Sequence, residues 1–541
     1  MRATPYAVLP ASLLAIVLAW SPVASGAVAG GVDDASVTST AAPETTSSPG
    51  TTSGPETTSA PTSAPEPTTP TEVRPRIAPL SSPLGQISEG VLPERGAVSM
   101  AISEELSSRW LGPSGRRAVT IRDALTGASL ADRNADLLVV PASTTKILSA
   151  AAVVSALDPE HTFTTRVVSG PEPDMVVLVA GGDMMLARGA GDPEAVVGRV
   201  GLADLAAQTA QALADRGSEE PIRVSVDLSH VPGPTVLDSW TEGWVSHGYT
   251  GRIVQLGLAE DLALPFAPSP AHPAQEAAKA FREALEDAGV DVAGDSDADV
   301  PEIELGDAAA SSGVSEDAAS SGVSDDAASS GENDDATTTD APTVDGPGIE
   351  LAAGESAPVR DVLAHALATS DNAMVEQLVR QAADAAGLPT DRASVTDWIR
   401  QVAQEDYGVD VTGMRIADAS GLSDGTRIPV AAVADVLVAG ANGSHPELQE
   451  VLAAGGLPIA GYTGTLSTRF HLPVHEPAIG NARAKTGSLP NVTSLAGTVV
   501  TRDGRLLVFA MTADRIGEDG AVLEARSVLD EVVAELARCG C

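Results

Sequence analysis

Two stretches of low sequence complexity limit how much of this 541-residue chain can build a folded core. Residues 30–86 are rich in Thr, Ser and Pro, and residues 295–346 consist mainly of Ala, Ser, Gly and acidic side chains. Neither composition supplies enough apolar surface to offset the entropy lost on folding. We therefore predict a disordered linker over 30–86 and an unstructured acidic insertion over 295–346.

The N-terminus has the layout of a secretory signal peptide, which we assign to residues 1–29. Arg2 precedes an apolar run over residues 7–20, and small residues follow around 24–29. The run is shorter than the ~20 residues of a membrane span, although an uncleaved anchor is the alternative. Either arrangement predicts an exported, extracytoplasmic protein that is secreted or held at the membrane or cell wall of a bacterium.

The chain is strongly acidic, with a formal net charge of −42. Such a charge repels phosphate groups, which argues against nucleic acid as a partner.

The pattern outside the low-complexity blocks predicts an α+β fold. Residues 118–123 indicate a strand, and residues 494–501 and 505–512 indicate a hairpin that turns at Asp503-Gly504. The stretch after Ser143 and the closing segment from about 520 to 537 favour helices. We expect an antiparallel sheet that is built from both ends of the chain and packed with helices.

Only three lysines occur among the 32 basic residues, and two of them lie in motifs that also carry hydroxyl groups. The first motif is Ser143-Thr-Thr-Lys146. At this spacing on a helix, the two side chains share one face. A buried lysine can lose its proton near neutral pH, so its amine can take the serine proton. A capping serine before a surface lysine has the same spacing and is the alternative.

The second and third motifs are Ser370-Asp371-Asn372 and Lys485-Thr486-Gly487-Ser488. In the second, a serine can relay a proton and an asparagine can hold a carbonyl, although the same residues suit a helix N-cap. In the third, an amine and two hydroxyls can bind a carboxylate, the last amide can serve an oxyanion hole, and the glycine allows close approach to a strand edge. Together and in this order, the three motifs are typical of serine acyl-transfer enzymes that act on penicillins or D-alanyl peptides.

With these motifs the chain resembles the penicillin-binding D-alanyl-D-alanine carboxypeptidases and endopeptidases of peptidase family S13. Segments 181–183, 418–423, 457–466 and 494–497 add to the resemblance. The resemblance implies the penicillin-binding serine transferase fold, with additional domains inserted between Ser143-x-x-Lys146 and Ser370-Asp371-Asn372. We place a transpeptidase-like catalytic domain at residues 87–170 and 347–541, and the inserted domains at 171–294.

The resemblance also implies five catalytic residues. Ser143 becomes the nucleophile and Lys146 the base that activates it. Ser370 becomes the proton relay, Asn372 a ligand of the substrate carbonyl, and Lys485 a positive charge for the substrate carboxylate.

Substrate binding is expected from Thr486, Gly487 and Ser488, which join Lys485 in holding the carboxylate. Asp227 matches, weakly, an acidic position that contacts the side chain of the stem peptide. A structural Asp at the end of a strand is the alternative for that residue.

The implied activity is that of a serine DD-peptidase, which hydrolyses D-alanyl-D-alanine bonds of peptidoglycan stem peptides through an acyl-enzyme and is inhibited by β-lactams. It would act as a carboxypeptidase, an endopeptidase or both. A β-lactamase or serine esterase on the same site is one alternative, although no Glu-x-x-Leu-Asn segment follows the second motif. A wall-binding or penicillin-sensing module without turnover is the other, and turnover of a D-alanyl-D-alanine peptide distinguishes it from an enzyme.

No cofactor and no metal are expected. His471, His475 and Glu476 lie close in sequence, but Pro473 prevents a helix from bringing the histidines onto one face. The nine-residue repeats of the acidic insertion lack the glycine-rich pattern with apolar anchors that calcium-binding repeats show.

Overall fold

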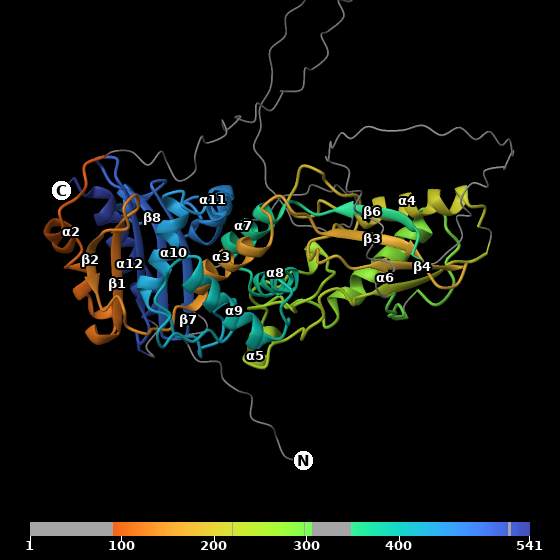
Figure 1. The fold of residues 1–541 in the computed structure, drawn as a ribbon, viewed down its shortest axis with the longest axis horizontal. Helices are drawn as coiled ribbons and strands as arrows, with labels where there is room; N and C mark the ends of the chain where they lie inside the picture. Colours follow the sequence, from red (N-terminus) through yellow and green to blue (C-terminus); the bar gives the residue numbers. More distant parts are fainter. Residues whose placement is uncertain (1–89, 219, 297, 306–347, 518–520, 541) are drawn as a thin grey trace, which may run out of the picture. The chain divides into compact units, whose positions relative to one another are not determined.

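The computed structural model describes residues 90–540 apart from 219, 297, 306–347 and 518–520. The predicted signal peptide, the predicted linker and most of the acidic insertion lie outside the described residues. Two sheets and the helices around them make up the described part (Figure 1). Among the described helices, none is long and apolar enough to cross a membrane.

Both ends of the folded region contribute to a five-stranded antiparallel sheet, as predicted. The strands lie in the order β2 (Ser129–Arg133), β1 (Arg117–Asp123), β9 (Leu506–Ala513), β8 (Val492–Val500) and β7 (Ala482–Leu489). The predicted C-terminal hairpin is formed by β8 and β9. Every residue of β9 is buried, because both faces of the sheet are covered, and the strand therefore reads as a continuous apolar run.

The two faces of this sheet pack against different helices. Leu507 and Phe509 belong to the hydrophobic core that contains α12 (Val522–Arg538) and α2 (Arg95–Ala101). Val508 and Ala510 belong to the core that contains α10 (Val430–Ala441) and its neighbour α11 (Pro446–Val451). The alternation of side chains along the strand thus divides the two cores.

A group of helices lies next to α10 and α3. These are α7 (Val359–Thr369), α8 (Asn372–Ala385) and α9 (Arg392–Glu405). The central helix α3 (Lys146–Ala156) contacts α8, α9 and α10, and its residues 146–154 are all buried. Its alanines allow neighbouring helices to approach closely, while Lys146 is left without access to solvent.

The second sheet has four strands and lies in the segment between the first two motifs. Its order is β5 (Arg223–Asp227), β4 (Met175–Val179), β3 (Thr164–Ser169) and β6 (Glu350–Glu355), and β4 and β5 are parallel. Helices α4 (Leu202–Asp215) and α6 (Pro273–Asp287) pack on it, and the short α5 (Glu242–Ser246) follows β5. The predicted boundaries at 170 and 347 assign β3 and β6 to the catalytic domain, but these strands complete the second sheet.

The start of the acidic insertion is also placed too early at residue 295. Val300 is 1% exposed. The backbone of this segment hydrogen-bonds to β5, from Val226 N to Pro301 O and from Ile303 N to Val226 O. The sequence Val-Pro-Glu-Ile-Glu-Leu over 300–305 alternates apolar and polar residues after Pro301, a strand pattern that the acidic composition around it conceals.

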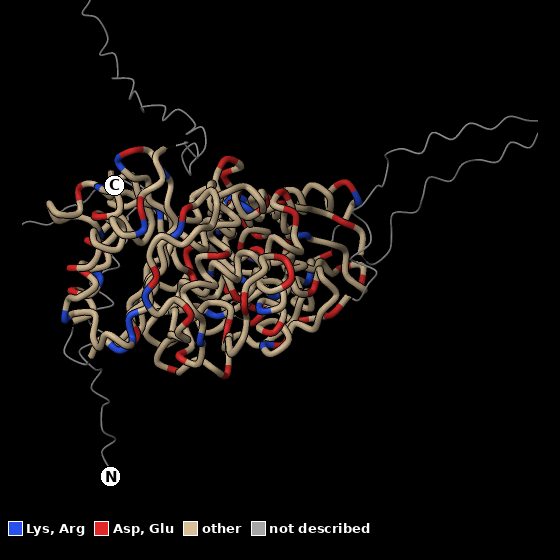
Figure 2. Tube along the Cα trace, turned by 60° about the vertical axis from the view of Figure 1, so that its left-hand side comes forward, with Lys and Arg blue, Asp and Glu red and all other residues tan. Residues whose placement is uncertain are grey.

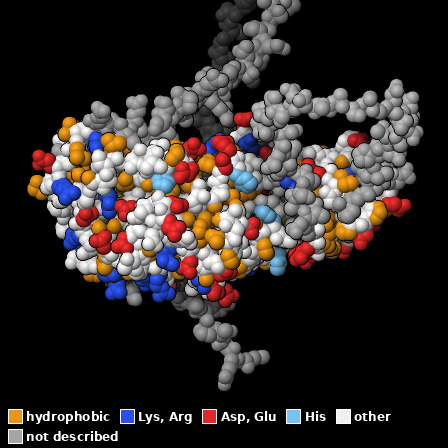
Figure 3. Space-filling view, viewed as in Figure 1, with side chains coloured by type: hydrophobic (Ala, Val, Ile, Leu, Met, Phe, Trp, Pro, Cys, Tyr) orange, Lys and Arg blue, Asp and Glu red, His pale blue; other side chains and the backbone are white. Residues whose placement is uncertain are grey.

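Acidic residues are found along most of the described trace, with basic residues between them (Figure 2). On the face shown in Figure 3, acidic side chains are spread widely, and basic side chains gather at the lower left.

The packing of residues 298–305 predicts which part of the insertion can be removed without a loss of stability. Replacing residues 308–345 with a flexible linker of about ten Gly and Ser residues, which reaches up to ~33 Å, should change the melting temperature by less than about 2 °C. Removing residues 298–305 as well should lower it by roughly 4–8 °C, because buried Val300 and the hydrogen bonds to β5 are lost. Differential scanning fluorimetry of the two variants measures both values. Equal stability of the two variants would contradict the packing described here.

Candidate active site

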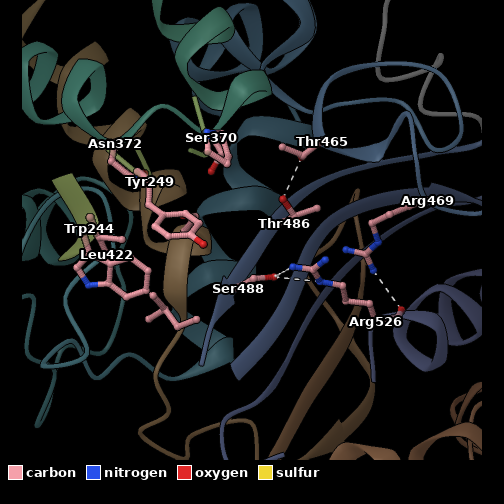
Figure 4. Close-up of a pocket in the computed structure, with 13 residues that line it drawn as sticks. Trp244, Tyr249, Ser370, Asn372, Leu422, Thr465, Arg469, Thr486, Ser488 and Arg526 are labelled. Atoms are coloured by element: carbon pink, nitrogen blue, oxygen red, sulfur yellow. Dashed lines mark hydrogen bonds between the residues drawn. The ribbon is translucent and has the colours of Figure 1, made fainter. Parts of the chain in front are cut away.

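The three motifs come from separate elements and meet at one pocket (Figure 4). Ser143 lies in a 3-10 turn, Ala142–Thr145, directly before α3. Ser370 and Asn372 flank the junction of α7 and α8. The third motif lies on β7, the edge strand of the five-stranded sheet, as predicted.

The amine of Lys146 is fully buried and hydrogen-bonded to three neutral acceptors. It donates to Ser143 Oγ at 3.2 Å, to Asn372 Oδ1 at 2.6 Å and to the carbonyl of Ser420 at 2.7 Å. Burial lowers the pKa of Lys146 to about 8. A substantial neutral fraction is therefore present near pH 8, and this fraction is able to accept a proton from Ser143.

Two buried carboxylates oppose the lowering of the Lys146 pKa, although neither accepts a hydrogen bond from its amine. Glu376, on α8, accepts a hydrogen bond from Ser420 N at 2.8 Å, and Asp418 accepts one from Trp240 Nε1 at 2.9 Å. Their negative charges oppose the effect of burial on the pKa of Lys146. Burial and the neighbouring charge of Asp418 in turn raise the pKa of Glu376 to about 7.

A second lysine and serine form a similar pair. Lys485 is fully buried, and its amine donates to Ser370 Oγ at 2.8 Å and to the carbonyl of Thr486 at 3.0 Å. Burial and the positive charge of Lys146 hold the pKa of Lys485 well below its usual value. The sequence predicts a charged Lys485 that faces a carboxylate, whereas in the structure its amine points at Ser370.

The backbone at Ser370 is left-handed, with φ 61° and ψ 32°. This conformation is unfavourable for a residue other than glycine, by roughly 1–3 kcal/mol. It ends α7 and lets Asp371 cap α8 by accepting a hydrogen bond from Met374 N. This motif therefore caps a helix and lines the pocket at the same time. Asp371 caps α8, and the residues on either side of it, Ser370 and Asn372, both line the pocket.

Gly487 allows β7 to pass very close to the turn that carries Ser143. A Cβ at this position would lie 2.1 Å from Ser494 Oγ, 2.8 Å from Pro141 O and 3.0 Å from Ser143 N. The sequence predicts that this glycine lets a ligand approach the strand closely, whereas the close neighbours in the structure are the Ser494 hydroxyl and the backbone of the turn that carries Ser143. The other two members of the motif present hydroxyls to the pocket, Thr486 next to Thr465 and Ser488 next to Arg526.

A comparison with known proteins agrees with this arrangement. The family model described as the D-Ala-D-Ala carboxypeptidase 3 (S13) family matches residues 102–263 and 330–536. The chain belongs to this family. The matched ranges include all the motif residues of the pocket.

Similar proteins cover most of the chain. Carboxypeptidase DacB of Mycolicibacterium smegmatis is 30% identical over 456 residues, which span 83% of this chain and 85% of that protein. The D-alanyl-D-alanine carboxypeptidase of an Actinomadura species is 27% identical over 424 residues, which span 72% of this chain and 76% of that protein. Penicillin binding protein 4 of Haemophilus influenzae, at 19% identity, matches the fold with a TM-score of 0.57 over 80% of this chain and 99% of that chain. This match confirms the predicted penicillin-binding fold.

One predicted substrate-binding residue lies elsewhere. Asp227 is at the end of β5 and does not line this pocket, but it lines a second cavity together with residues of β3 and β4. Its two carboxylate oxygens accept backbone hydrogen bonds, one from Ser229 N at 2.8 Å and one from Leu305 N at 2.9 Å. These two hydrogen bonds fasten the segments that follow β5, which is the role of the structural alternative, and contact with a stem peptide stays a prediction.

The pocket also contains residues that the sequence analysis did not select. Trp244 and Tyr249 come from the segment around α5, and their rings meet edge to face at 5.3 Å. Aromatic residues make up only 3% of the chain. Two of them within six positions could therefore have marked this segment as part of a binding site. Arg526 was harder to find, since Arg526 and Asp530 have the spacing of an ordinary surface ion pair on a helix. In the structure, Asp530 pairs with Arg469 instead.

The tight contact at Gly487 predicts a stability effect. Gly487→Ala should destabilise the protein by about 1–3 kcal/mol, because the new methyl group overpacks the site. Adding Ser494→Ala should restore part of that loss, since it removes the nearest clashing atom. Gly96→Ala in α2 is the matched control, because a Cβ there meets nothing within 4 Å, and it should be neutral or stabilising. Urea unfolding measures all of these, and equal effects of Gly487→Ala and Gly96→Ala would contradict the close approach.

Proposed function

We propose that the protein is an exported serine DD-peptidase that hydrolyses D-alanyl-D-alanine bonds of peptidoglycan stem peptides, as a carboxypeptidase, an endopeptidase or both. One observation carries the proposal. Two buried amines of lowered pKa each contact a serine hydroxyl, and both serines line the same pocket. This arrangement supplies one pair to activate a nucleophile and a second pair to move the proton to the leaving group.

In the first half-reaction, Ser143 Oγ attacks the carbonyl of the penultimate D-alanine while neutral Lys146 takes the hydroxyl proton. Ser370, with Lys485 beside it, then relays that proton from Lys146 to the departing amine as the C–N bond breaks. The terminal D-alanine leaves, and an ester of Ser143 remains. In the second half-reaction the hydroxyl of a water molecule joins the acyl carbon, the ester bond to Ser143 breaks, and the water proton goes to Ser143 Oγ as the shortened peptide leaves.

The other motif residues would position the substrate. Asn372 Nδ2 donates one hydrogen bond to the carbonyl of Tyr249 at 2.9 Å, so its second N–H is available for a substrate carbonyl. β7 is an edge strand, so its free backbone groups can face a ligand, and the amide of Ser488 would stabilise the oxyanion. The hydroxyls of Thr486 and Ser488 would hold the carboxylate of the terminal D-alanine.

The relatives support this assignment. The DacB protein of M. smegmatis is named a carboxypeptidase, and the Actinomadura protein is named a D-alanyl-D-alanine carboxypeptidase. The Haemophilus influenzae protein has also been solved in complex with a β-lactam. We therefore propose β-lactams as inhibitors, and the N-terminal sequence supports export.

The chemistry at Ser143 has a direct test. A penicillin should form a covalent adduct on Ser143 that persists for minutes or longer, and a D-alanyl-D-alanine peptide should lose its terminal D-alanine. Intact-mass measurement and assay of released D-alanine show the two results, and both should disappear in Ser143→Ala. An adduct that survives in Ser143→Ala would contradict the proposal.

The same experiment separates the alternatives. Rapid release of hydrolysed penicillin indicates a β-lactamase. Stable labelling without turnover of peptide indicates a penicillin-sensing module.

The role of Lys146 predicts a matched result for two lysine variants. Lys146→Arg should slow acylation by penicillin ~10²–10⁴-fold, because a guanidinium stays charged and cannot act as a base. Lys279→Arg is the control, since this partly exposed lysine of α6 pairs with Asp299 at 2.8 Å and belongs to no motif. In the wild type, the acylation rate should rise about tenfold per pH unit at low pH and level off above the lysine pKa of about 8. A rate that is flat from pH 6 to 9, or equal rates for the two variants, would rule out this role.

A further inference from the structure

Arg526 is a buried cation in the pocket that lacks a carboxylate partner among the described residues. It projects from α12, lines the pocket and is 7% exposed. The neighbouring Arg469 also lines the pocket, but it pairs with Asp530 at 2.6 Å. Figure 4 shows the two guanidinium groups close together, with Arg526 directed at Ser488.

The charge of Arg526 is electrostatically unfavourable among the protein groups that surround it. Burial and the positive charge of Arg469 lower the pKa of Arg526 to about 10, so the group is still charged at neutral pH. Its Nη1 atom is buried and has no hydrogen-bond partner within the described part of the chain. The negative charge of Asp530 opposes this effect only in part, because Asp530 is itself paired with Arg469, so an anion bound in the pocket would relieve the remaining cost of the buried charge.

Arg526 also determines what Ser488 can offer to a ligand. Ser488 Oγ accepts hydrogen bonds from Arg526 Nη2 at 2.7 Å and from Arg526 Nε at 3.2 Å. With its oxygen occupied by these two donors, the hydroxyl has its own proton left to donate. That proton can be donated to an acceptor in the pocket, such as a carboxylate.

We propose that Arg526, acting through the hydroxyl of Ser488, is the positioning residue that supplies the positive charge for the free C-terminal carboxylate of the substrate. This inference rests on the proposed DD-peptidase function and assigns the carboxylate charge to a residue outside the three motifs. Lys485 is less suited to that role, because its amine is already hydrogen-bonded to Ser370 and Thr486. A local cation is needed, since the chain as a whole carries a charge of −42 and repels anions.

The test compares two substrates that differ only at the carboxylate. One is a peptide ending in D-alanyl-D-alanine, and the other is the same peptide with a C-terminal amide. For the wild type, kcat/KM should be roughly 100-fold higher for the acid, the order expected for a buried charge-assisted interaction. Arg526→Gln should lower kcat/KM for the acid by about the same factor and leave the amide nearly unchanged, so that the preference disappears.

Two further variants separate this role from a general effect on the fold. Arg526→Lys retains the charge and should restore a part of the acid preference. Arg538→Gln, which removes a half-exposed arginine at the end of the same helix, should leave both substrates unaffected. Equal wild-type rates on the acid and the amide would overturn the inference but leave the DD-peptidase proposal intact. A preference for the acid that persists in Arg526→Gln would also overturn it, whereas a wild type that cleaves neither peptide would overturn both proposals.

Discussion

Two lysine amines are held out of water in the same pocket, and the arrangement of the surrounding elements follows from the need to satisfy them. A buried ammonium requires acceptors for its hydrogen bonds, and direct contact with a carboxylate would keep it protonated. Lys146 finds a hydroxyl, an amide oxygen and a backbone carbonyl, while Lys485 finds a hydroxyl and a backbone carbonyl. Helix α3, the junction of α7 and α8, and strand β7 must all meet to provide these acceptors. Glu376 and Asp418 do not hydrogen-bond to the amine of Lys146, but their negative charges oppose the effect of burial on its pKa. The pKa of Lys146 therefore falls only to about 8.

The segment between the first two motifs supports the site as well as forming its own sheet. The carbonyl of Tyr249 holds the amide of Asn372, and the indole of Trp240 holds the carboxylate of Asp418. Asn372 and Asp418 both act on Lys146, one by a hydrogen bond and the other by its charge. Residues of this segment therefore tune the buried amine although none of them belongs to a motif.

The sequence predicted the features that depend on local pattern. The terminal strands, the hairpin at Asp503-Gly504, the helix after Ser143 and the three motifs all follow from periodicity, turn chemistry and residue type. It did not reveal features that depend on contacts between distant residues. Asp227 has the residue type of a ligand, but one of the backbone amides that donate hydrogen bonds to its carboxylate belongs to Leu305. Leu305 is far from Asp227 in the sequence, so this contact could not be predicted from local pattern. Arg526 likewise stands out only because Asp530 forms its ion pair with Arg469. The spacing of Arg526 and Asp530 along α12 would instead suggest that these two residues pair with each other.

Burial lowers the pKa of both Lys146 and Lys485 while the fold is intact. Because the chain has only three lysines, ¹³C labelling at lysine Cε gives three NMR signals, which the Lys279→Arg and Lys485→Arg variants assign. On titration with pH, the Lys146 signal should move with a midpoint of about 8, and the Lys485 signal should also move well below the usual 10.5. The Lys279 signal should move above that value, because a hydrogen bond to Asp299 raises the pKa of Lys279. Three midpoints near 10.5 would contradict the account.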